Sequence, residues 1–311
     1  MRITSNMMTK DFLKNLNTNL TSLAKSQRQI ATGKVMTRLS DDPVRLISSL
    51  QCRAKLSKLE HYKNALGAAT DWLDQTESSV SELNDIVKTA YETAVRMSND
   101  FLSSDDKQAA AALIGQLRDH ALMLANSQSS DKYIFGGYNV DKKPFTVDGS
   151  GNILYNGVDL TDAADPDLID MASQNIEYEI GYDSTMKISI TGAEFLGMGE
   201  DNLYTVLNNF YNALQSDANA DEIGVFVEKL AGAQTRTLTT QSKVGGMVNR
   251  LELLQNRYEH ETLTYKERKS NLEDIDIAEA YLNYSLAQTV YNASLQVGTE
   301  IIQRTILDYI R

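Results

Sequence analysis

The chain has 311 residues, of which 30 are Lys or Arg and 42 are Asp or Glu, so its net charge is −12. Neutralising phosphates takes clustered Lys and Arg, and crossing a membrane takes about 18 consecutive apolar residues, so this composition argues against nucleic-acid-binding and membrane-spanning proteins. Only 3 residues are proline, far below the roughly 5% of average usage, which permits very long uninterrupted helices.

The first 40 residues are basic and carry a helical apolar stripe. They contain seven Lys or Arg and one Asp, a balance of +6. Apolar residues three and four positions apart predict an amphipathic helix that turns one face towards other helices. The stripe comprises Leu13, Leu16, Leu20, Leu23, Gln27 and Ile30.

A second, much longer helix is predicted to begin at Pro43. Asp41 and Asp42 supply an acidic cap, and proline is favoured at the first helical position. An apolar seam then alternates steps of three and four residues, as in a coiled coil. Its members are Leu59, Tyr62, Leu66, Ala69, Leu73, Thr76, Val80, Leu83, Val87, Ala90, Ala94 and Met97.

A third helix and a β-rich segment follow. Residues 103–106 read S-S-D-D, which predicts a capping box. The helix after it carries Leu113, Leu117, Ala121 and Leu124 on one face. Residues 145–147 and 153–155 flank a Gly- and Asp-rich turn, which predicts a hairpin. Two further runs, 176–180 and 186–190, alternate with period two and predict strands.

Helices return after Asp201. One predicted helix has an apolar face formed by Leu203, Val206, Leu207, Phe210 and Leu214. A second very long helix is expected from about Asp221. Its seam contains Thr240, Val244, Met247, Leu251, Leu254 and Tyr258, and it weakens towards Ile275. Gly245 and Gly246 lower helix propensity in that stretch and leave a kink possible.

A final helix is predicted from about Ile277 to Ile310. Residues 280–299 carry no charge, although a surface helix normally has Lys and Glu on its wet face. We therefore expect copies of the protein or partners to pack around this segment; the alternative is a buried helix of one globular domain. Together with Leu13, Leu16, Leu20, Leu23 and Ile30, the predicted assembly interface comprises Leu286, Val290, Leu295, Val297, Ile301 and Ile302.

These elements predict a mainly α chain with a β-rich insert (α+β). The N- and C-terminal parts would pair as a long antiparallel coiled-coil-like rod, with a small β domain in the middle of the sequence. Residues 1–42 with 276–311 would form terminal helical core segments. Residues 43–131 with 200–275 would form a long-helix bundle, and residues 132–199 a β-rich outer insert.

Residues typical of catalysis or metal binding are scarce. His61, His120 and His260 lie in no metal-ligand spacing, and Cys52 is a single cysteine among apolar neighbours. Residues 148–159 place oxygen-bearing side chains at three ligand positions of an EF-hand loop. A non-glycine residue stands at its sharp turn, so a hairpin turn is favoured over calcium binding. We expect no enzyme, no cofactor, no metal and no cleaved secretory signal.

Short motifs at both ends of the chain resemble those of bacterial flagellins and their relatives. Residues 30–34 read I-A-T-G-K and residues 40–43 read S-D-D-P, similar to the family's S-T-G-K-R and P-S-D-D-P, although Leu39 stands where the family usually has Pro. Residues 274–280 read D-I-D-I-A-E-A, and residues 288–295 contain Q and Y-N-A-S-L, similar to the family's ending. The N-terminal motif residues are Gly33, Lys34, Ser40, Asp41, Asp42 and Pro43.

The opening M-R-I-T-S-N-M-M and the run Y-I-F-G-G-Y at 133–138 are more similar to the hook-associated protein 3 branch than to flagellin itself. That resemblance implies a structural subunit that joins the hook, through hook-associated protein 1, to the flagellin filament. It also implies a ring of copies, an export chaperone, type III export to the extracellular flagellum without signal cleavage, and terminal segments that become ordered on assembly. Two alternatives stay open: a flagellin or minor filament subunit, and a coiled-coil adhesin or pore-forming helical protein.

Overall fold

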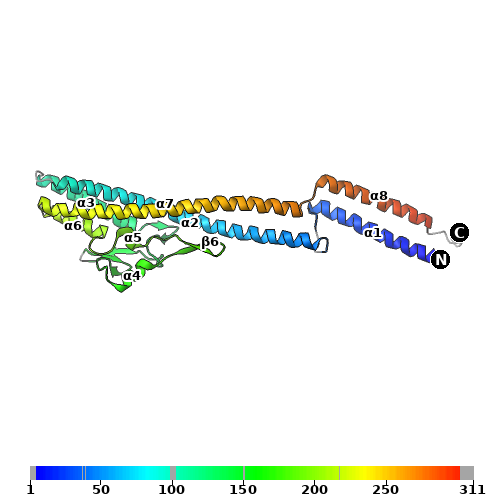
Figure 1. Cartoon of the computed structure of the whole chain (residues 1–311), viewed down its shortest axis with the longest axis horizontal. Coiled ribbons are helices and arrows are strands. Elements are labelled where there is room, and N and C mark those ends of the chain that lie inside the picture. Colours follow the sequence, from blue (N-terminus) through cyan, green and yellow to red (C-terminus); the bar gives the residue numbers. More distant parts are fainter. Residues whose placement is uncertain are drawn as a thin grey trace. The chain divides into compact units, whose positions relative to one another are not determined.

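The computed structural model describes residues 5–36, 38, 40–98, 103–149, 151–216 and 218–301. Its packing divides the chain into two compact units (Figure 1). Unit 1 comprises Met1–Leu59 and Glu259–Arg311, and unit 2 comprises Glu60–Tyr258. Long helices dominate the chain and short strands lie in its middle, so the predicted fold class, mainly α with a β-rich insert, is confirmed. No helix of the described part is long and apolar enough to cross a membrane.

Unit 1 is built from two helix pairs. α1 (Ser5–Thr32) lies antiparallel to α8 (Ile277–Ile301), and the start of α2 (Pro43–Met97) lies beside the end of α7 (Ala220–Glu273). The Asn19 side chain of α1 donates a hydrogen bond of 2.7 Å to Ser294 of α8. Gly298 is buried, and its missing side chain leaves room for the Phe12 ring. α1 and α8 are therefore in close contact near the N-terminal end of α1.

The long helix α2 begins where the sequence predicted. The Asp42 carboxylate accepts a hydrogen bond of 3.0 Å from the backbone N–H of Arg45, and Pro43 is the first helical residue. Every member of the seam predicted from Leu59 to Met97 is buried. In unit 2 the rings of Tyr62 and Tyr258 stack with centroids 5.8 Å apart, which joins α2 to α7. The heptad pattern thus identified the packed face of α2 correctly.

α3 (Ser104–Ala125) and α6 (Leu203–Gln215) pack together in unit 2. The capping box predicted at Ser103 is confirmed, because its side chain accepts from the Asp106 backbone N–H at 3.2 Å and the Asp106 carboxylate accepts in return. The predicted face of α6 is buried throughout. The predicted face of α3 is partly wrong, because Leu113 and Leu117 are only half-buried. Its buried residues are Ala110, Ala111, Ile114, Ala121, Leu124 and Ala125.

The shift of the α3 face has a steric reason. A Cβ atom on Gly115 would lie 3.3 Å from the Tyr211 ring of α6, so α6 approaches α3 closely at this point. Small residues permit such an approach. The predicted face was based on leucines and therefore omitted the small residues that form the contact. Arg118 of α3 adds a polar contact, donating to Asn208 of α6 at 2.8 Å.

The described residues of the insert between α3 and α6 form three small antiparallel sheets. The predicted hairpin is confirmed, with Phe145 paired to Tyr155 and Val147 to Ile153. The second predicted pair also forms, but its later strand ends before Ile188. The strands are β1 (Gln128–Ser129), β2 (Lys132–Tyr133), β3 (Phe145–Val147), β4 (Ile153–Tyr155), β5 (Val158–Asp159), β6 (Glu177–Gly181) and β7 (Ser184–Lys187).

Aromatic residues form the core of this insert, beside the short helices α4 (Pro166–Ser173) and α5 (Gly192–Leu196). Phe135 and Phe195 stack with centroids 3.9 Å apart. The buried Tyr155 hydroxyl donates to the Phe135 carbonyl at 2.9 Å, and burial raises the pKa of Tyr155 to about 12. Tyr258 of α7 donates to the Ile180 carbonyl at 2.6 Å, which anchors the insert to the helices of unit 2. α7 itself is one continuous helix through Gly245 and Gly246.

Candidate assembly site on the terminal helices

The predicted assembly residues on α1 divide into two sets. Leu16, Leu23 and Ile30 are half-buried. Leu13 and Leu20 are 54% and 45% exposed. The first set lies on the more buried side of α1, and the second set offers apolar surface to solvent.

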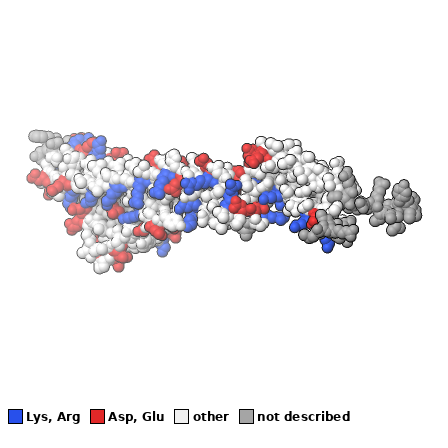
Figure 2. Space-filling view, turned by 45° about the vertical axis from the view of Figure 1, so that its right-hand side comes forward, with Lys and Arg blue, Asp and Glu red and all other residues white. Residues whose placement is uncertain are grey.

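On α8 the predicted residues are exposed wherever their side chains are described. Leu286 is 64% exposed, and the others follow the same pattern: Val290, Leu295 and Val297 are 43%, 42% and 50% exposed. Ile301 is the last residue of α8, but its side chain lies outside the described residues, as does all of Ile302. Figure 2 shows the surface of the α1–α8 pair, at the right, as mostly white and therefore poor in charge.

An apolar groove of about 570 Å³ runs between α1 and α8. Met8, Phe12 and Leu16 line it from α1, and Val290 and Val297 line it from α8. The groove brings one predicted residue of α1, Leu16, together with two of α8. Asp11, Asn15 and Ser294 also line the groove. This pair of helices therefore presents a largely apolar groove, beside exposed apolar side chains of both helices.

The N-terminal motif meets the C-terminal motif where α1 ends. Gly33 adopts a positive φ of 65°, and its N–H donates to the Gln29 carbonyl at 2.9 Å. Helices commonly end at a glycine in this conformation. The Gly33 carbonyl then accepts from Ile275 N–H at 3.1 Å, and Val35 N–H donates to the Glu273 carbonyl at 2.8 Å. Lys34 is thereby paired with Asp274 in an isolated β-bridge.

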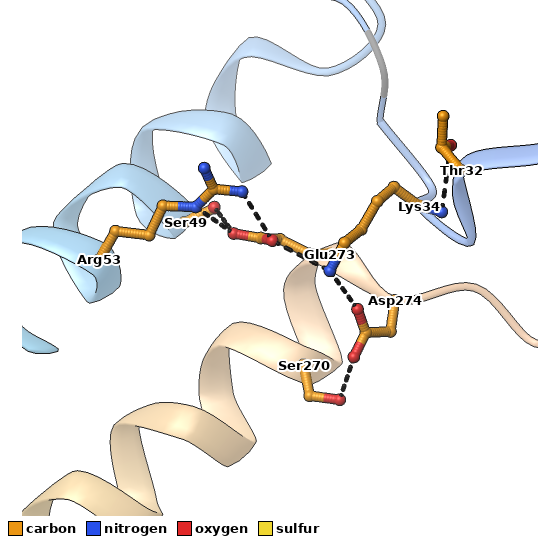
Figure 3. Close-up of polar contacts among 7 residues, drawn as sticks. All are labelled: Thr32, Lys34, Ser49, Arg53, Ser270, Glu273 and Asp274. Carbon is orange, nitrogen blue, oxygen red and sulfur yellow. Dashed lines mark hydrogen bonds and ion pairs between the residues drawn. The ribbon is translucent and has the colours of Figure 1, made fainter. Parts of the chain in front are cut away.

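The side chains at this bridge form an ion-pair cluster (Figure 3). Lys34 Nζ lies 2.5 Å from Asp274 Oδ1 and 3.3 Å from Glu273 Oε2. Arg53 of α2 donates to the two oxygens of Glu273 at 2.7 and 2.8 Å, and Ser49 donates to Oε1. Glu273 is only 4% exposed. A buried charge is costly unless it is paired, and Arg53, Ser49 and Lys34 provide the compensating contacts.

The pKa values follow these contacts. Hydrogen bonds from Arg53, then from Ser49 and Lys34, lower the pKa of Glu273 to about 2, against the opposing effect of burial. The hydrogen bond from Lys34 also lowers the pKa of Asp274, and the same bond raises the pKa of Lys34. The cluster is therefore fully ionised at neutral pH and joins α1, α2 and α7 electrostatically.

The remaining motif residues shape the turn between α1 and α2. The Asp41 carboxylate accepts from the Arg38 backbone N–H at 2.9 Å and lies 3.9 Å from Lys25 Nζ of α1. Asp42 caps α2 ahead of Pro43, as described above, and Ser40 lies in the turn before them. The motif thus positions the start of α2 against the end of α1.

Sequence reasoning missed Ser49, Arg53 and Glu273. Ser49 and Arg53 are four residues apart and therefore share one face of α2, but nothing in the sequence names their partner. Glu273 directly precedes the Asp274 motif, which is the one signal that could have drawn attention to it. This cluster is structural, since its groups neutralise one another.

The other candidate sites have structural explanations in the part of the chain that is described. Asp148 accepts from Asn152 N–H at 2.8 Å, a contact that closes the turn between β3 and β4. Cys52 is buried and has a free thiol. Among the described residues, no group of three His, Cys, Asp or Glu is placed to hold a metal ion.

Two family models match the sequence. The model of the bacterial flagellin N-terminal helical region matches residues 3–140, and the model of the C-terminal helical region matches residues 227–310. Together they cover more than half of the chain. The stretch between them contains most of the β-rich insert.

Two proteins of similar sequence share one name, flagellar hook-associated protein 3. The flagellar hook-associated protein 3 of Salmonella typhimurium is 25% identical over 326 residues, which is 97% of this chain and 97% of that protein. The protein of that name from Escherichia coli is 26% identical over 324 residues, with the same coverage of both chains.

Solved structures share the fold. The flagellar junction protein FlgL from Legionella pneumophila superposes with a TM-score of 0.60 at 14% identity, covering 73% of this chain and 100% of that one. FlgL from Bacillus cereus gives a TM-score of 0.56 at 19% identity, covering 70% and 97%. With matching models at both ends and full-length relatives of one name, the chain belongs to the bacterial flagellin family, in the branch of flagellar hook-associated protein 3.

Proposed function

We propose that this protein is a structural subunit of the bacterial flagellum that joins the hook to the flagellin filament. The observation that carries the proposal is the exposed apolar surface of α1 and α8, because a monomer leaves that surface in contact with water. Contiguous exposed apolar surface marks an interaction site. In this proposal neighbouring subunits cover it, and the protein performs no catalysis.

The energetics favour assembly through these helices. Burying apolar surface contributes about 25 cal/mol per Å², so covering one half-exposed Leu or Val contributes on the order of 1 kcal/mol. Leu13, Leu20 and Leu286 are among several such residues. A neighbour that packs along the full length of the pair therefore gains several kcal/mol in total.

The composition of α8 supports the same conclusion. Residues 280–299 contain no charged side chain, so neighbouring protein can surround this helix without desolvating an ion. Its Asn, Gln, Ser and Thr side chains can exchange water for hydrogen bonds with adjacent helices. We propose that residues 1–42 and 276–311 form the inner core of the assembly, residues 43–131 with 200–275 the next layer, and residues 132–199 the outer insert.

The proposed partners follow from this role. Hook-associated protein 1 lies on the hook side, flagellin on the filament side, and further copies of the chain complete a ring. Before assembly a flagellar export chaperone holds the exposed apolar helices, and export to the extracellular flagellum proceeds without signal cleavage. The terminal segments become fully ordered in the assembly.

Deleting the gene tests this function directly. Mutant cells are expected to build hooks but to release flagellin into the medium, and a plasmid copy of the wild-type gene is expected to restore attached filaments. Electron microscopy of hooks and immunoblots of the culture supernatant measure both results. Attached filaments of normal length in the deletion strain would refute the proposal.

A filament subunit is the second candidate. A flagellin from Clostridium tyrobutyricum is 25% identical over 127 residues, but the match covers only 41% of this chain and 34% of that protein. The purified protein distinguishes the two functions. Long filaments grown from this chain alone would favour a filament subunit, and failure to polymerise alone is expected for a junction protein.

A further inference from the structure

The hairpin of β4 and β5 turns at an Asn-Gly pair, the only such pair in the sequence. Asn156 and Gly157 form a two-residue loop between the paired residues Tyr155 and Val158, with φ angles of 51° and 93°. Turns of this kind favour Asn-Gly because both residues need a positive φ. The same pair is chemically labile, because asparagine is a thermolabile residue and glycine leaves the following backbone nitrogen unhindered.

The backbone nitrogen of Gly157 is accessible. Gly157 is exposed, and a Cβ atom added to it would meet no other atom within 4 Å. Its N–H makes no hydrogen bond to any residue that the structure describes. The nitrogen that follows the Asn156 side chain is therefore neither covered nor held by a neighbour.

The Asn156 side chain ties this turn to the segment after β2. Its Nδ2 atom donates to the Gly136 carbonyl at 3.1 Å, and its buried Oδ1 atom accepts no hydrogen bond from the described residues. Gly136 lies in a tight turn, where a Cβ atom would collide with the Asn139 carbonyl. The amide group of Asn156 thus holds a segment that has little freedom to rearrange around a different side chain.

We propose that Asn156 is a site of spontaneous deamidation in the folded protein. The Gly157 nitrogen loses its proton to water or hydroxide and attacks the side-chain carbonyl carbon of Asn156. A five-membered succinimide ring closes, and ammonia leaves with a proton taken from the solvent. Water then adds to either carbonyl of the ring and opens it, which leaves aspartate or isoaspartate at position 156. In sum, one side-chain amide and one water become one carboxylic acid and one ammonia, without an oxidant or a reductant.

The product cannot make the contacts of the amide. A carboxylate only accepts hydrogen bonds, so the donor to the Gly136 carbonyl becomes an oxygen that repels it. Its other oxygen occupies a buried position, where a charge without a donor is costly. Isoaspartate also adds a methylene group to the main chain and so lengthens the loop between Tyr155 and Val158. Either product weakens the link between the turn and the segment after β2.

The consequence extends to the aromatic core of the insert. Phe135 precedes Gly136, stacks on Phe195, and accepts a hydrogen bond from the buried Tyr155 hydroxyl through its carbonyl. Deamidation changes the residue that directly follows Tyr155 and repels the residue that directly follows Phe135. The reaction therefore converts a tightly packed insert into a looser one, at a rate set by the chemistry of one turn.

Peptide mapping of the aged full-length protein tests the proposal. The purified protein is incubated in its native state at 37 °C, and mass spectrometry follows the replacement of the NH₂ group by OH at each asparagine. Conversion at Asn156 is expected to be several-fold faster at pH 8.5 than at pH 6.5, because the attacking nitrogen must lose its proton. Asn152 and Asn175 precede isoleucines, whose branched side chains hinder attack, so Asn156 is expected to convert at least about tenfold faster than either.

A variant tests the structural consequence. Asn156→Asp reproduces one product, and its Asn139 amide, which donates to the Gly136 carbonyl at 3.2 Å, is expected to exchange hydrogen several-fold faster than in the wild type. Gln128→Glu makes the same change of amide to carboxylate at an exposed position of the insert and is expected to leave that exchange unchanged. If Asn156→Asp does not fold, the aged wild-type protein takes its place in the exchange measurement.

Three results would overturn the proposal. The first is an intact Asn156 in the folded protein under conditions in which a urea-unfolded sample converts. The second is conversion no faster at Asn156 than at Asn152 and Asn175, and the third is unchanged exchange at Asn139 once the carboxylate is present. All of these measurements use the isolated chain, so they stand apart from the test of the proposed function in the deletion strain.

Discussion

Replacing Glu273 by Gln removes the buried charge on which the ion-pair cluster of unit 1 is centred. The carboxylate receives two hydrogen bonds from Arg53, one from Ser49 and a contact from Lys34. A glutamine keeps the shape but offers one acceptor oxygen and turns an NH₂ group towards these donors. Unit 1 is therefore expected to lose stability where α1, α2 and α7 meet.

The size of the loss follows from the pKa. A carboxyl group whose pKa falls from 4.5 in the unfolded chain to about 2 in the folded one would contribute roughly 3 kcal/mol at neutral pH. The Arg53 and Lys34 side chains are 54% and 39% exposed, and water screens their charges. We therefore expect Glu273→Gln to cost about 1–2 kcal/mol at pH 7.

Hydrogen exchange measures this loss of stability at individual backbone amides. The amide N–H groups of Val35 and Ile275 bond across the bridge beside the cluster, to the carbonyls of Glu273 and Gly33. A loss of 1–2 kcal/mol is expected to speed their exchange by a factor of about 5–30 at pH 7. Glu267→Gln, at an exposed position of the same helix, is the matched control and is expected to leave both amides unchanged.

The pH dependence provides the strictest check. Because the folded-state pKa of Glu273 lies below its unfolded value, its contribution is complete above about pH 4.5 and disappears as the pH falls towards 2. The difference between variant and wild type is expected to shrink over that range. Equal exchange of the two proteins at pH 7, or a difference that persists undiminished at pH 2, would refute the reasoning.

Four further substitutions test the packing of the chain and the proposed assembly surface. Gly298→Ala would push a methyl group into the Phe12 ring and cost about 1–3 kcal/mol, measurable as faster exchange in α1, and unchanged exchange there would contradict the close contact. Leu16→Asp or Val290→Asp is expected to abolish motility while circular dichroism stays native, because assembly would bury an unpaired carboxylate; full motility would contradict this. Gly192→Ala would overlap two buried aromatic rings and is expected to lower stability to urea by about 1–3 kcal/mol, and an unchanged midpoint would count against the insert core.

Periodic packing was readable from the sequence. The seam of α2 follows a strict alternation of three and four, and each of its members is buried, because a regular helix turns those positions to one side. The start of α2 and the capping box of α3 were also readable, since Asp42, Pro43 and Ser103 act on residues within one turn of themselves. Helical periodicity and helix caps could be predicted because they depend on residues that are close together in the sequence.

The face of α3 and the end of β7 were not readable, because both depend on partners distant in the chain. On α3, Gly115 faces the ring of Tyr211 and Leu113 and Leu117 are only half-buried, because α6 approaches the small residues of α3. After β7, Ile188 still donates to the Ile176 carbonyl at 3.1 Å, although regular pairing has stopped. Neither partner is signalled by local pattern.

The candidate site also combines residues that the sequence indicated with residues that it did not. The motifs around Lys34 and Asp274 were found separately by resemblance, but their contact joins residues 240 positions apart. The charged partner Glu273 and its donors Ser49 and Arg53 carry no motif of their own. Only the folded chain shows that these residues meet at one ion-pair cluster.

That long-range contact links local stability to the proposed assembly surface. Closing so long a loop costs conformational entropy, which must be offset by contacts formed when the ends meet. Lys34, Arg53 and Glu273 supply such contacts at the place where α1 ends and α8 is about to begin. A chain shortened before Glu273 would lose both the cluster and α8, so its α1 would lack the partner helix that completes the apolar groove. The proposed assembly surface therefore needs both α1 and α8, joined through this cluster.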